Sequence, residues 1–287
     1  MENIPQLMRR ISKEKKVLQS IIEKDYALSY LLAAIHSTDG LKENLVLKGG
    51  TALKKCYFNT YRFSEDLDYS TRVKEPIANI DLHISFVVER MKSLLNEKGP
   101  FQVFFERLVM RFPHPNEQHA YIIRVQFPEQ GQALCRLKVE ITVDEPIFTT
   151  TETRTVLHNF PEHLDCRIPV YSLIEITAEK LRALLQSKDR LLDRGWGATR
   201  VCRDYYDLWN LLQQTEIIST ELIPLLSKKC SVRGVSFESP LDFIPENLIT
   251  VAYSEWKQQI LPFIPGSIPA SELLPQVQKL ILSIWNK

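Results

Sequence analysis

Residues 45–53 read Leu-Val-Leu-Lys-Gly-Gly-Thr-Ala-Leu, and residues 63–69 read Phe-Ser-Glu-Asp-Leu-Asp-Tyr. The first segment predicts a strand that ends in a glycine turn, and the second predicts a strand that carries two carboxylates two residues apart. Because side chains alternate along a strand, Asp66 and Asp68 project to one face and Leu67 to the other. Two carboxylates this close repel each other, and a hard divalent cation with oxygen ligands is the usual resolution.

The glycine pair before the aspartates is typical of a phosphate-binding turn. Gly49 and Gly50 allow backbone N–H groups to come close to a phosphate, and Thr51 is predicted to cap the helix that follows. A helix N-terminus favours anions. A glycine turn suited to phosphates, next to an aspartate pair suited to magnesium, predicts a site for a nucleoside triphosphate.

Composition limits the class of protein. A chain of 287 residues with 44% apolar content is large enough for one large or two ordinary domains with a real core. Its 36 basic and 35 acidic residues give a formal charge of +1, which argues against a broadly basic nucleic-acid binder but permits a local patch. Five cysteines without C-x-x-C spacing predict reduced thiols in a cytosolic protein.

The localisation expected from the sequence is cytoplasmic. The first 16 residues are polar and basic and lack the apolar core of a signal peptide. No apolar run approaches the length that spans a bilayer. The sequence therefore predicts no membrane partner.

The order of periodic segments predicts an α+β fold, with a mixed or antiparallel sheet flanked by helices and a helical C-terminal part. The first domain, residues 1–169, is predicted to contain leading helices over 4–36, strands over 44–47 and 66–70, helices over 51–58 and 80–95, and an antiparallel meander over 101–112, 120–127 and 134–144. The second, residues 170–287, is predicted to contain a helix opened by Ser172 and further helices over 199–213, 220–229, 245–261 and 271–286.

A third carboxylate is expected from the last meander strand. Alternation there places Lys138 and Glu140 on one face, opposite the apolar residues between them. If this strand lies beside the Asp66 strand, Glu140 is placed to hold a second metal or to accept a proton, with Lys138 balancing charge. The alternative is that Glu140 belongs to the solvated face of an edge strand.

The helical part contains a lysine and a pair of aspartates that are candidates for the nucleotide site. Lys180 lies next to the apolar stripe of its helix, where its ammonium emerges at a packed boundary and is placed to contact a triphosphate. Asp204 and Asp207 lie at i and i+3 on a later helix, close enough to pair with Lys180 or with Arg200 and Arg203. Ordinary helix–helix ion pairing is the alternative.

The segment between those helices, residues 188–200, gathers three arginines and a tryptophan. Guanidinium groups contact phosphates and an indole stacks on an unpaired base, so Arg190, Arg194, Arg200 and Trp196 predict a contact with RNA. A buried tryptophan with solvated arginines is the alternative.

In this order the motifs resemble the AbiEii/AbiGii nucleotidyltransferase toxins, which include the MenT toxins and belong to the DNA polymerase β-like superfamily. The resemblance covers about residues 45–212 and rests on Gly49-Gly-Thr-Ala-Leu53, Arg62-Phe-Ser-Glu-Asp-Leu-Asp68, Leu137-Lys-Val-Glu-Ile141, Glu179-Lys-Leu-Arg182 and Arg203-Asp-Tyr-Tyr-Asp207. At position 140 the chain has Glu where the family is expected to favour Asp, and Glu also ligates magnesium.

The resemblance implies transfer of a nucleoside monophosphate from an NTP, with release of pyrophosphate. It implies a toxin of a toxin–antitoxin or abortive-infection system, and some relatives add nucleotides to the 3′ end of tRNA. Transferred residue by residue, the roles are as follows: Asp66, Asp68 and Glu140 hold Mg²⁺ (or Mn²⁺); Gly49, Gly50, Thr51, Ser64 and Lys138 contact the nucleotide; Lys180 neutralises the triphosphate; and Asp204 orients it.

Three alternatives stay open at this level. The acceptor is RNA in the first hypothesis, and a protein or a small hydroxylated molecule in the second. In the third, the chain is a binding module that senses a nucleotide without catalysis. The sequence leaves open the choice of NTP, the oligomeric state, the existence of an antitoxin, the role of residues 219–287, and whether Asp204 or Asp207 acts in the site.

Overall fold

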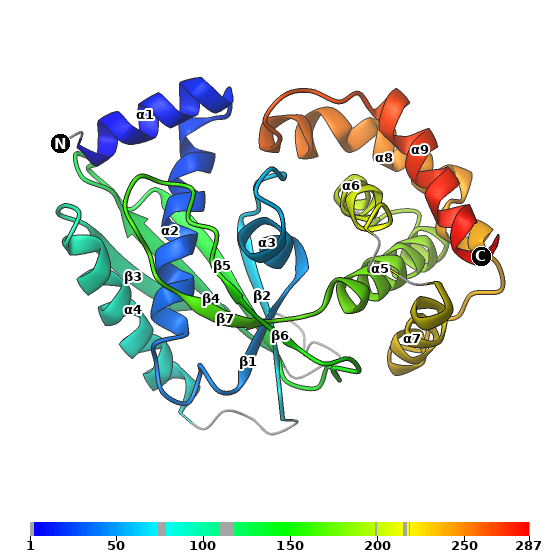
Figure 1. Cartoon of the computed structure of the whole chain (residues 1–287), viewed down its shortest axis with the longest axis horizontal. Coiled ribbons are helices and arrows are strands. Elements are labelled where there is room, and N and C mark those ends of the chain that lie inside the picture. The colour runs from blue at the N-terminus through cyan, green and yellow to red at the C-terminus, as the bar shows by residue number, and fades with distance from the viewer. Residues whose placement is uncertain are drawn as a thin grey trace. The chain divides into compact units, whose positions relative to one another are not determined.

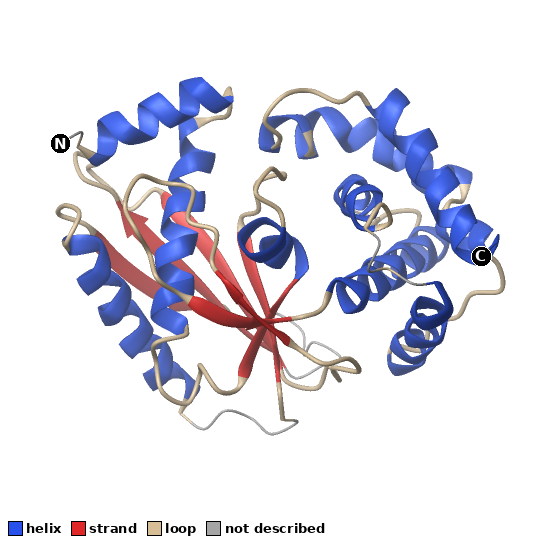
Figure 2. Cartoon of the chain, in the orientation of Figure 1, coloured by secondary structure: helices blue, strands red, loops and turns tan. Residues whose placement is uncertain are grey.

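The computed structural model describes residues 3–73, 79–109, 118–198, 200–214, 217 and 219–286. The chain divides into two compact units, Met1–Tyr171 and Ser172–Lys287, where the sequence placed a boundary between residues 169 and 170. The sheet lies entirely in the first unit, and the described elements of the second unit are all helical (Figure 2).

The first unit is built on a mixed seven-stranded sheet, counted over the described residues, in the order β3-β4-β5-β2-β1-β7-β6. β2 pairs in parallel with β5 and antiparallel with β1, and β1 pairs in parallel with β7. The strands are β1 (Leu45–Lys48), β2 (Asp66–Thr71), β3 (Gln102–Arg107), β4 (Gln118–Gln126), β5 (Cys135–Thr142), β6 (Glu152–Thr155) and β7 (Arg167–Val170).

The helices of this unit cover the apolar face of the sheet. α2 (Gln19–Ile35) and α4 (Ile80–Asn96) pack against each other beside the strands, and α1 (Ile4–Lys15) packs on α2 (Figure 1). Leu67 of β2 and Val139 of β5 are buried on this face. Alternation therefore sends their neighbours Asp66, Asp68 and Glu140 to the opposite face.

The predicted α+β class and the antiparallel meander β3-β4-β5 are confirmed. The segment 4–36 forms two helices separated by a turn at residues 16–18. The prediction for residues 110–112 lies outside the described residues. β6 and β7 were not predicted, because each has only four residues, β6 is polar, and β7 contains Pro169.

The loop after α2 holds a histidine whose ring nitrogens are both buried without a hydrogen-bond partner. Burial lowers the pKa of His36 to about 4, so the folded chain keeps this ring neutral. The unfolded chain takes up a proton below about pH 6.5, which favours unfolding between about pH 6.5 and pH 4. His36→Phe removes this proton uptake. We therefore expect the unfolding free energy of the variant, taken relative to that of the parent chain, to be about 2 kcal/mol higher at pH 5 than at pH 7.5.

Urea denaturation followed by circular dichroism at both pH values measures this difference. His163→Gln is the control, because it removes a histidine whose side chain is exposed. An equal difference for His36→Phe at the two pH values would show that protonation of His36 does not contribute to acid unfolding.

The second unit is a helical bundle around one buried ion-pair network. Lys229 Nζ lies 2.7 Å from Glu175 Oε1 and 3.2 Å from Glu179 Oε1, and the Lys229 and Glu175 side chains are wholly buried. Ser172 caps α5 by accepting a hydrogen bond from the Glu175 N–H. The helices are α5 (Leu173–Arg194), α6 (Val201–Leu211), α7 (Ser219–Val232), α8 (Glu246–Gln259) and α9 (Ala270–Ser283), with short 3-10 turns at Pro240–Phe243, Leu261–Phe263 and Ile284–Asn286.

Two further expectations concern bulk properties. All five cysteines are buried and free of disulfide bonds, as predicted for reduced thiols. Within the described ranges, none of the helices has the length and apolar character needed to cross a bilayer.

Candidate functional site

The glycine turn joins β1 directly to a short helix. Gly49 has a φ of +72°, which favours glycine, and a Cβ atom built there would lie 2.9 Å from Asp68 Oδ2. α3 (Gly49–Ala52) begins at this residue and continues as a π-helix over Leu53–Tyr57. The turn therefore lies directly against one carboxylate of the D-x-D pair.

The predicted capping role of Thr51 is wrong. Because the two glycines let the helix begin at once, Lys48 is the residue at the N-cap position and Thr51 lies inside the first turn. The buried Thr51 hydroxyl donates a hydrogen bond to the carbonyl oxygen of Asp66. Thr51 thereby ties the glycine turn to the start of β2.

The two aspartates and Glu140 lie on one face because of strand register. β2 and β5 run in parallel with Asp66 opposite Lys138 and Asp68 opposite Glu140. Residues opposite each other in neighbouring strands project to the same side. The condition set for Glu140, that its strand lie next to the Asp66 strand, is met, and β5 is an inner strand of the sheet.

Glu140 is held by two neighbours. Its Oε1 atom lies 2.9 Å from Lys138 Nζ and accepts a hydrogen bond of 3.1 Å from Gln118 Nε2. No group of three Asp, Glu, His or Cys side chains is placed to hold a metal ion among the residues that the structure describes. Magnesium commonly takes only one or two carboxylates, with water and substrate phosphates completing its shell. Asp66 and Asp68 fit this requirement by themselves, with Glu140 turned to Lys138.

The second glycine is packed against residues that flank the D-x-D pair. A Cβ atom on Gly50 would lie 2.6 Å from Arg62 Nη2 and 3.3 Å from Ser64 Oγ. Gly50, Arg62 and Ser64 are therefore direct neighbours at the mouth of the turn. Ser64, which the sequence proposed as a site residue, lies beside the glycine turn.

Two cations near the acids were not among the predicted site residues. Arg62 is buried with a guanidinium nitrogen directed at Gly50, and Lys48 is the register partner of Asp68 on β1. Strand alternation applied to residues 45–48 would have placed Lys48 on the acid face. The position of Arg62 depends on the path of the loop over residues 58–65, which the sequence does not specify.

In the second unit, Lys180 pairs with both aspartates of α6, which is one of the two pairings that the sequence left open. Its Nζ lies 2.7 Å from Asp204 Oδ1 and 2.8 Å from Asp207 Oδ2. The Asp207 side chain is wholly buried, whereas 16% of the Asp204 side chain is exposed. Asp204 is thus the more accessible of the two carboxylates.

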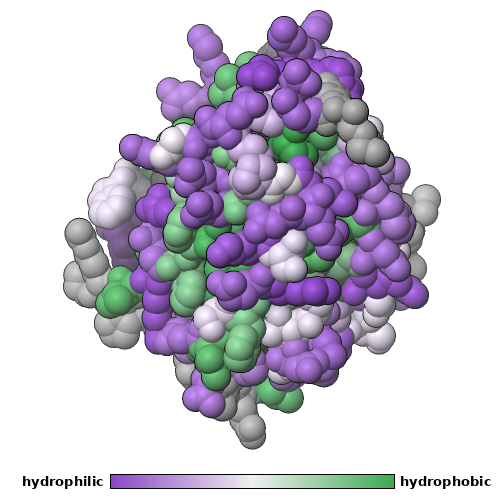
Figure 3. Space-filling view, turned by 90° about the vertical axis from the view of Figure 1, so that its left-hand side faces the viewer, coloured by the Kyte–Doolittle hydropathy of each residue, from purple (hydrophilic) through white to green (hydrophobic). Residues whose placement is uncertain are grey.

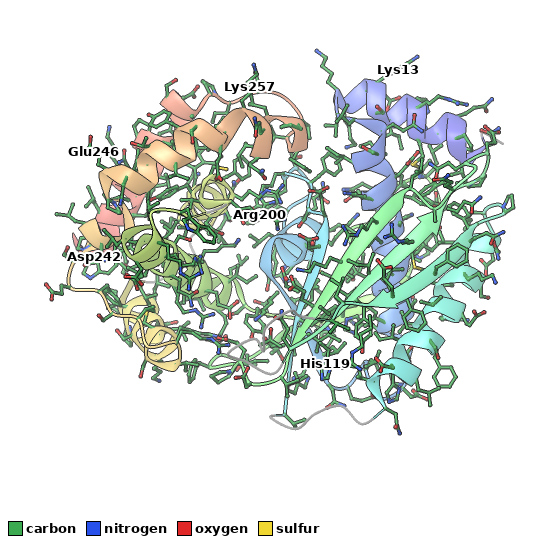
Figure 4. All side chains as sticks on the ribbon, turned by 180° about the vertical axis from the view of Figure 1, so that it is seen from behind. Lys13, His119, Arg200, Asp242, Glu246 and Lys257 are labelled. Carbon is green, nitrogen blue, oxygen red and sulfur yellow. The ribbon has the colours of Figure 1, made fainter. Side chains whose placement is uncertain are left out.

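The segment between α5 and α6 exposes its aromatic residue. Trp196 is 68% exposed, so the alternative of a buried tryptophan is wrong. Arg190, Arg194 and Arg200 are also exposed, and Figure 4 marks Arg200 at the start of α6. Arg190 donates to the Gly197 carbonyl and to Ser187 Oγ, which closes the loop around the helix end.

Comparison with known proteins agrees with this geometry. The chain matches the sequence model of the nucleotidyl transferase AbiEii toxin family, type IV TA system, over residues 30–280. Among solved structures it is similar to MenT4, a nucleotidyltransferase toxin from Mycobacterium tuberculosis H37Rv, with 20% identity, a TM-score of 0.63, and coverage of 98% of this chain and 90% of that one. This likeness shows a shared fold.

Other comparisons add little. Terminal uridylyl transferase 4 from Trypanosoma brucei, with bound CTP, is 11% identical over 95% of this chain and 67% of that one, but its TM-score of 0.25 carries no argument. No curated protein sequence matches significantly. The family match covers most of the chain and includes all the motifs that predicted it. The chain therefore belongs to the AbiEii family of nucleotidyltransferase toxins, which use an NTP and act in type IV toxin–antitoxin systems with an antitoxin as partner.

Proposed function

We propose that this chain is a Mg²⁺-dependent nucleotidyltransferase that transfers a nucleoside monophosphate from an NTP to the 3′ end of an RNA, with tRNA as the acceptor. The observation that carries the proposal is the contact between the glycine turn and Asp68, where a Cβ atom on Gly49 would lie 2.9 Å from Asp68 Oδ2. It brings the glycine turn and an aspartate of β2 together at one end of the inner strands, the arrangement that a phosphate site beside a metal site requires.

Each residue has a role in binding or chemistry. Asp66 and Asp68 would hold the magnesium ion, which would neutralise charge on the triphosphate. Gly49, Gly50 and Ser64 contact the phosphates, and Thr51 keeps the turn fixed to β2. Positioning and electrostatic stabilisation supply most of the catalysis in phosphoryl transfer.

Glu140 and Lys138 exchange partners in this proposal. The 3′ hydroxyl oxygen of the acceptor forms a bond to the α-phosphorus. The bond between the α-phosphorus and the oxygen that bridges it to the β-phosphate breaks, and pyrophosphate leaves. The hydroxyl proton passes to the Glu140 carboxylate, which then has to be free of the Lys138 ammonium now 2.9 Å away. Lys138 gains the triphosphate as its new partner.

The second unit is proposed to supply Lys180 to the triphosphate, with Asp204 orienting the ammonium. Support comes from the fixed position of the Lys180 side chain, which two carboxylates hold at 2.7 and 2.8 Å. Asp207 is wholly buried and is assigned a structural role, in which it holds the Lys180 ammonium in place.

Labelled nucleotides test the proposal. The purified chain is incubated with each α-labelled NTP together with total RNA or total protein. We expect label in the tRNA fraction, removable by a 3′ exonuclease, with release of pyrophosphate. EDTA should abolish the reaction and added Mg²⁺ should restore it.

Two results would favour the alternatives. Label found only in protein or in a small molecule would replace RNA as the acceptor, an outcome compatible with the near-neutral charge of the chain. Tight binding of an NTP without pyrophosphate release would indicate a nucleotide-sensing module and would contradict catalysis.

A further inference from the structure

The chain is nearly neutral, but its first helix is strongly basic. Residues 9–16 read Arg-Arg-Ile-Ser-Lys-Glu-Lys-Lys, with five basic residues and one acidic residue, for a net charge of +4. The whole chain carries only +1, so the remaining residues are net acidic. A concentration of charge this strong on one element is a recognised feature of polyanion-binding surfaces.

The charge lies on one side of α1. The opposite side is apolar and packs into the first unit through Ile4, Leu7, Met8 and Ile11, all buried. Arg9, Arg10, Lys13 and Lys16 are exposed, and we call these four residues the basic face. Figure 3 shows a largely hydrophilic surface at the height of α1, and Figure 4 marks Lys13 on this helix.

Helix stability alone does not account for the basic face. Cations in the last turn complement the helix macrodipole, which explains Lys13 and Lys15. Arg9 and Arg10 lie in the middle of the helix and gain little from this effect. Arg10 pairs with Glu14 at 2.8 Å, but both side chains are about half exposed, and such pairs contribute little to stability.

α1 is connected to the acids through α2, on which it packs. Lys24 of α2 lies 2.5 Å from Glu65, the residue before Asp66. The basic face and the D-x-D pair therefore lie in one unit, joined through α2.

We infer that the basic face of α1 binds the phosphate backbone of the RNA acceptor while the 3′ hydroxyl lies at the acids. The inference rests on the proposed function and assigns the surface that holds its acceptor. A helix of 12 residues is about 18 Å long, enough to follow the backbone for several nucleotides. Arginine and lysine contacts with phosphates are independent of base sequence, so this surface contributes affinity and position rather than specificity.

The test variant is Arg9→Gln, Arg10→Gln and Lys13→Gln combined. Glutamine is a good helix former, and the apolar face of α1 is unchanged. The control variant is Lys228→Gln, Lys257→Gln and Lys279→Gln, which removes the same charge from three exposed helical lysines of the second unit. Both variants are compared with the parent chain in thermal unfolding to establish that they fold.

Two measurements are made on each chain. One is the set of steady-state constants for nucleotide transfer to a tRNA transcript. The other is the binding of a fluorescent RNA hairpin with a single-stranded 3′ tail at several KCl concentrations. For the test variant we expect the KM for RNA to rise at least about tenfold, with an unchanged KM for NTP. We also expect the plot of the logarithm of the hairpin association constant against the logarithm of the KCl concentration to have a slope less steep by about 2. The control should match the parent chain.

The outcomes separate this inference from the proposed function. If the parent chain labels RNA and the test variant keeps the parent KM and salt slope, the basic face does not bind RNA, although the function stands. An equal loss in the control would assign the effect to net charge and overturn the assignment to α1. If the parent chain labels no RNA, the proposed function fails, and a loss of hairpin binding confined to the test variant would still locate a polyanion site on α1.

Discussion

Replacing Asp68 with asparagine is expected to lower the rate of nucleotide transfer at least about 10³-fold. Asparagine keeps the size of the side chain but removes the charge that would hold magnesium next to the glycine turn. Pyrophosphate release with each NTP measures the loss, and growth inhibition on expression gives a second readout.

Glu65→Gln is the matched control for this experiment. Glu65 lies directly before β2, and its carboxylate is bound by Lys24 at 2.5 Å. Its replacement should change the transfer rate no more than about twofold, because a partly exposed ion pair contributes at most about 1 kcal/mol. Full activity in the Asp68 variant, with Asp66 still present, would exclude the two-aspartate site.

The second large effect concerns stability. Lys229→Met is expected to lower the unfolding free energy of the second unit by about 3–5 kcal/mol, since it leaves the buried Glu175 carboxylate without its partner. All four tryptophans, Trp196, Trp209, Trp256 and Trp285, lie in this unit. Tryptophan fluorescence in a urea titration therefore reports the unfolding of this unit, while tyrosines and circular dichroism follow the whole chain.

Two further variants define the cause. Lys228→Met changes the neighbouring exposed lysine of α7 and should cost no more than about 0.5 kcal/mol. Combining Lys229→Met with Glu175→Gln removes both charges and should recover most of the lost stability. If the double variant is as unstable as Lys229→Met alone, lost packing of the lysine stem rather than an uncompensated charge is responsible.

Short-range patterns predicted the parts of the site that depend on neighbours in sequence. Alternation along a strand was enough to place Asp66 and Asp68 on one face, and Ser172 was identified as a helix cap from its spacing to Glu175. The spacing of Asp204 and Asp207 placed both on one helix face, and the structure shows that both contact Lys180. These inferences succeed because the backbone geometry of a strand or helix fixes the direction of nearby side chains.

Longer-range features were predicted less well. The role of Thr51 was misjudged because its true partner, the Asp66 carbonyl, is fifteen residues away. The exposure of Trp196 depends on what packs around its loop, which composition does not reveal. The insertion of β7 beside β1 pairs two short segments separated by more than a hundred residues.

By itself the sequence determined the glycine turn, the two aspartates on one strand face and the family, which the comparison confirms. Only the tertiary structure decided that β5 lies in parallel beside β2, which brings Glu140 opposite Asp68 and gives it Lys138 and Gln118 as partners. Strand pairing between distant segments is selected by burial of the whole apolar face, a sum over the entire core that no local pattern contains.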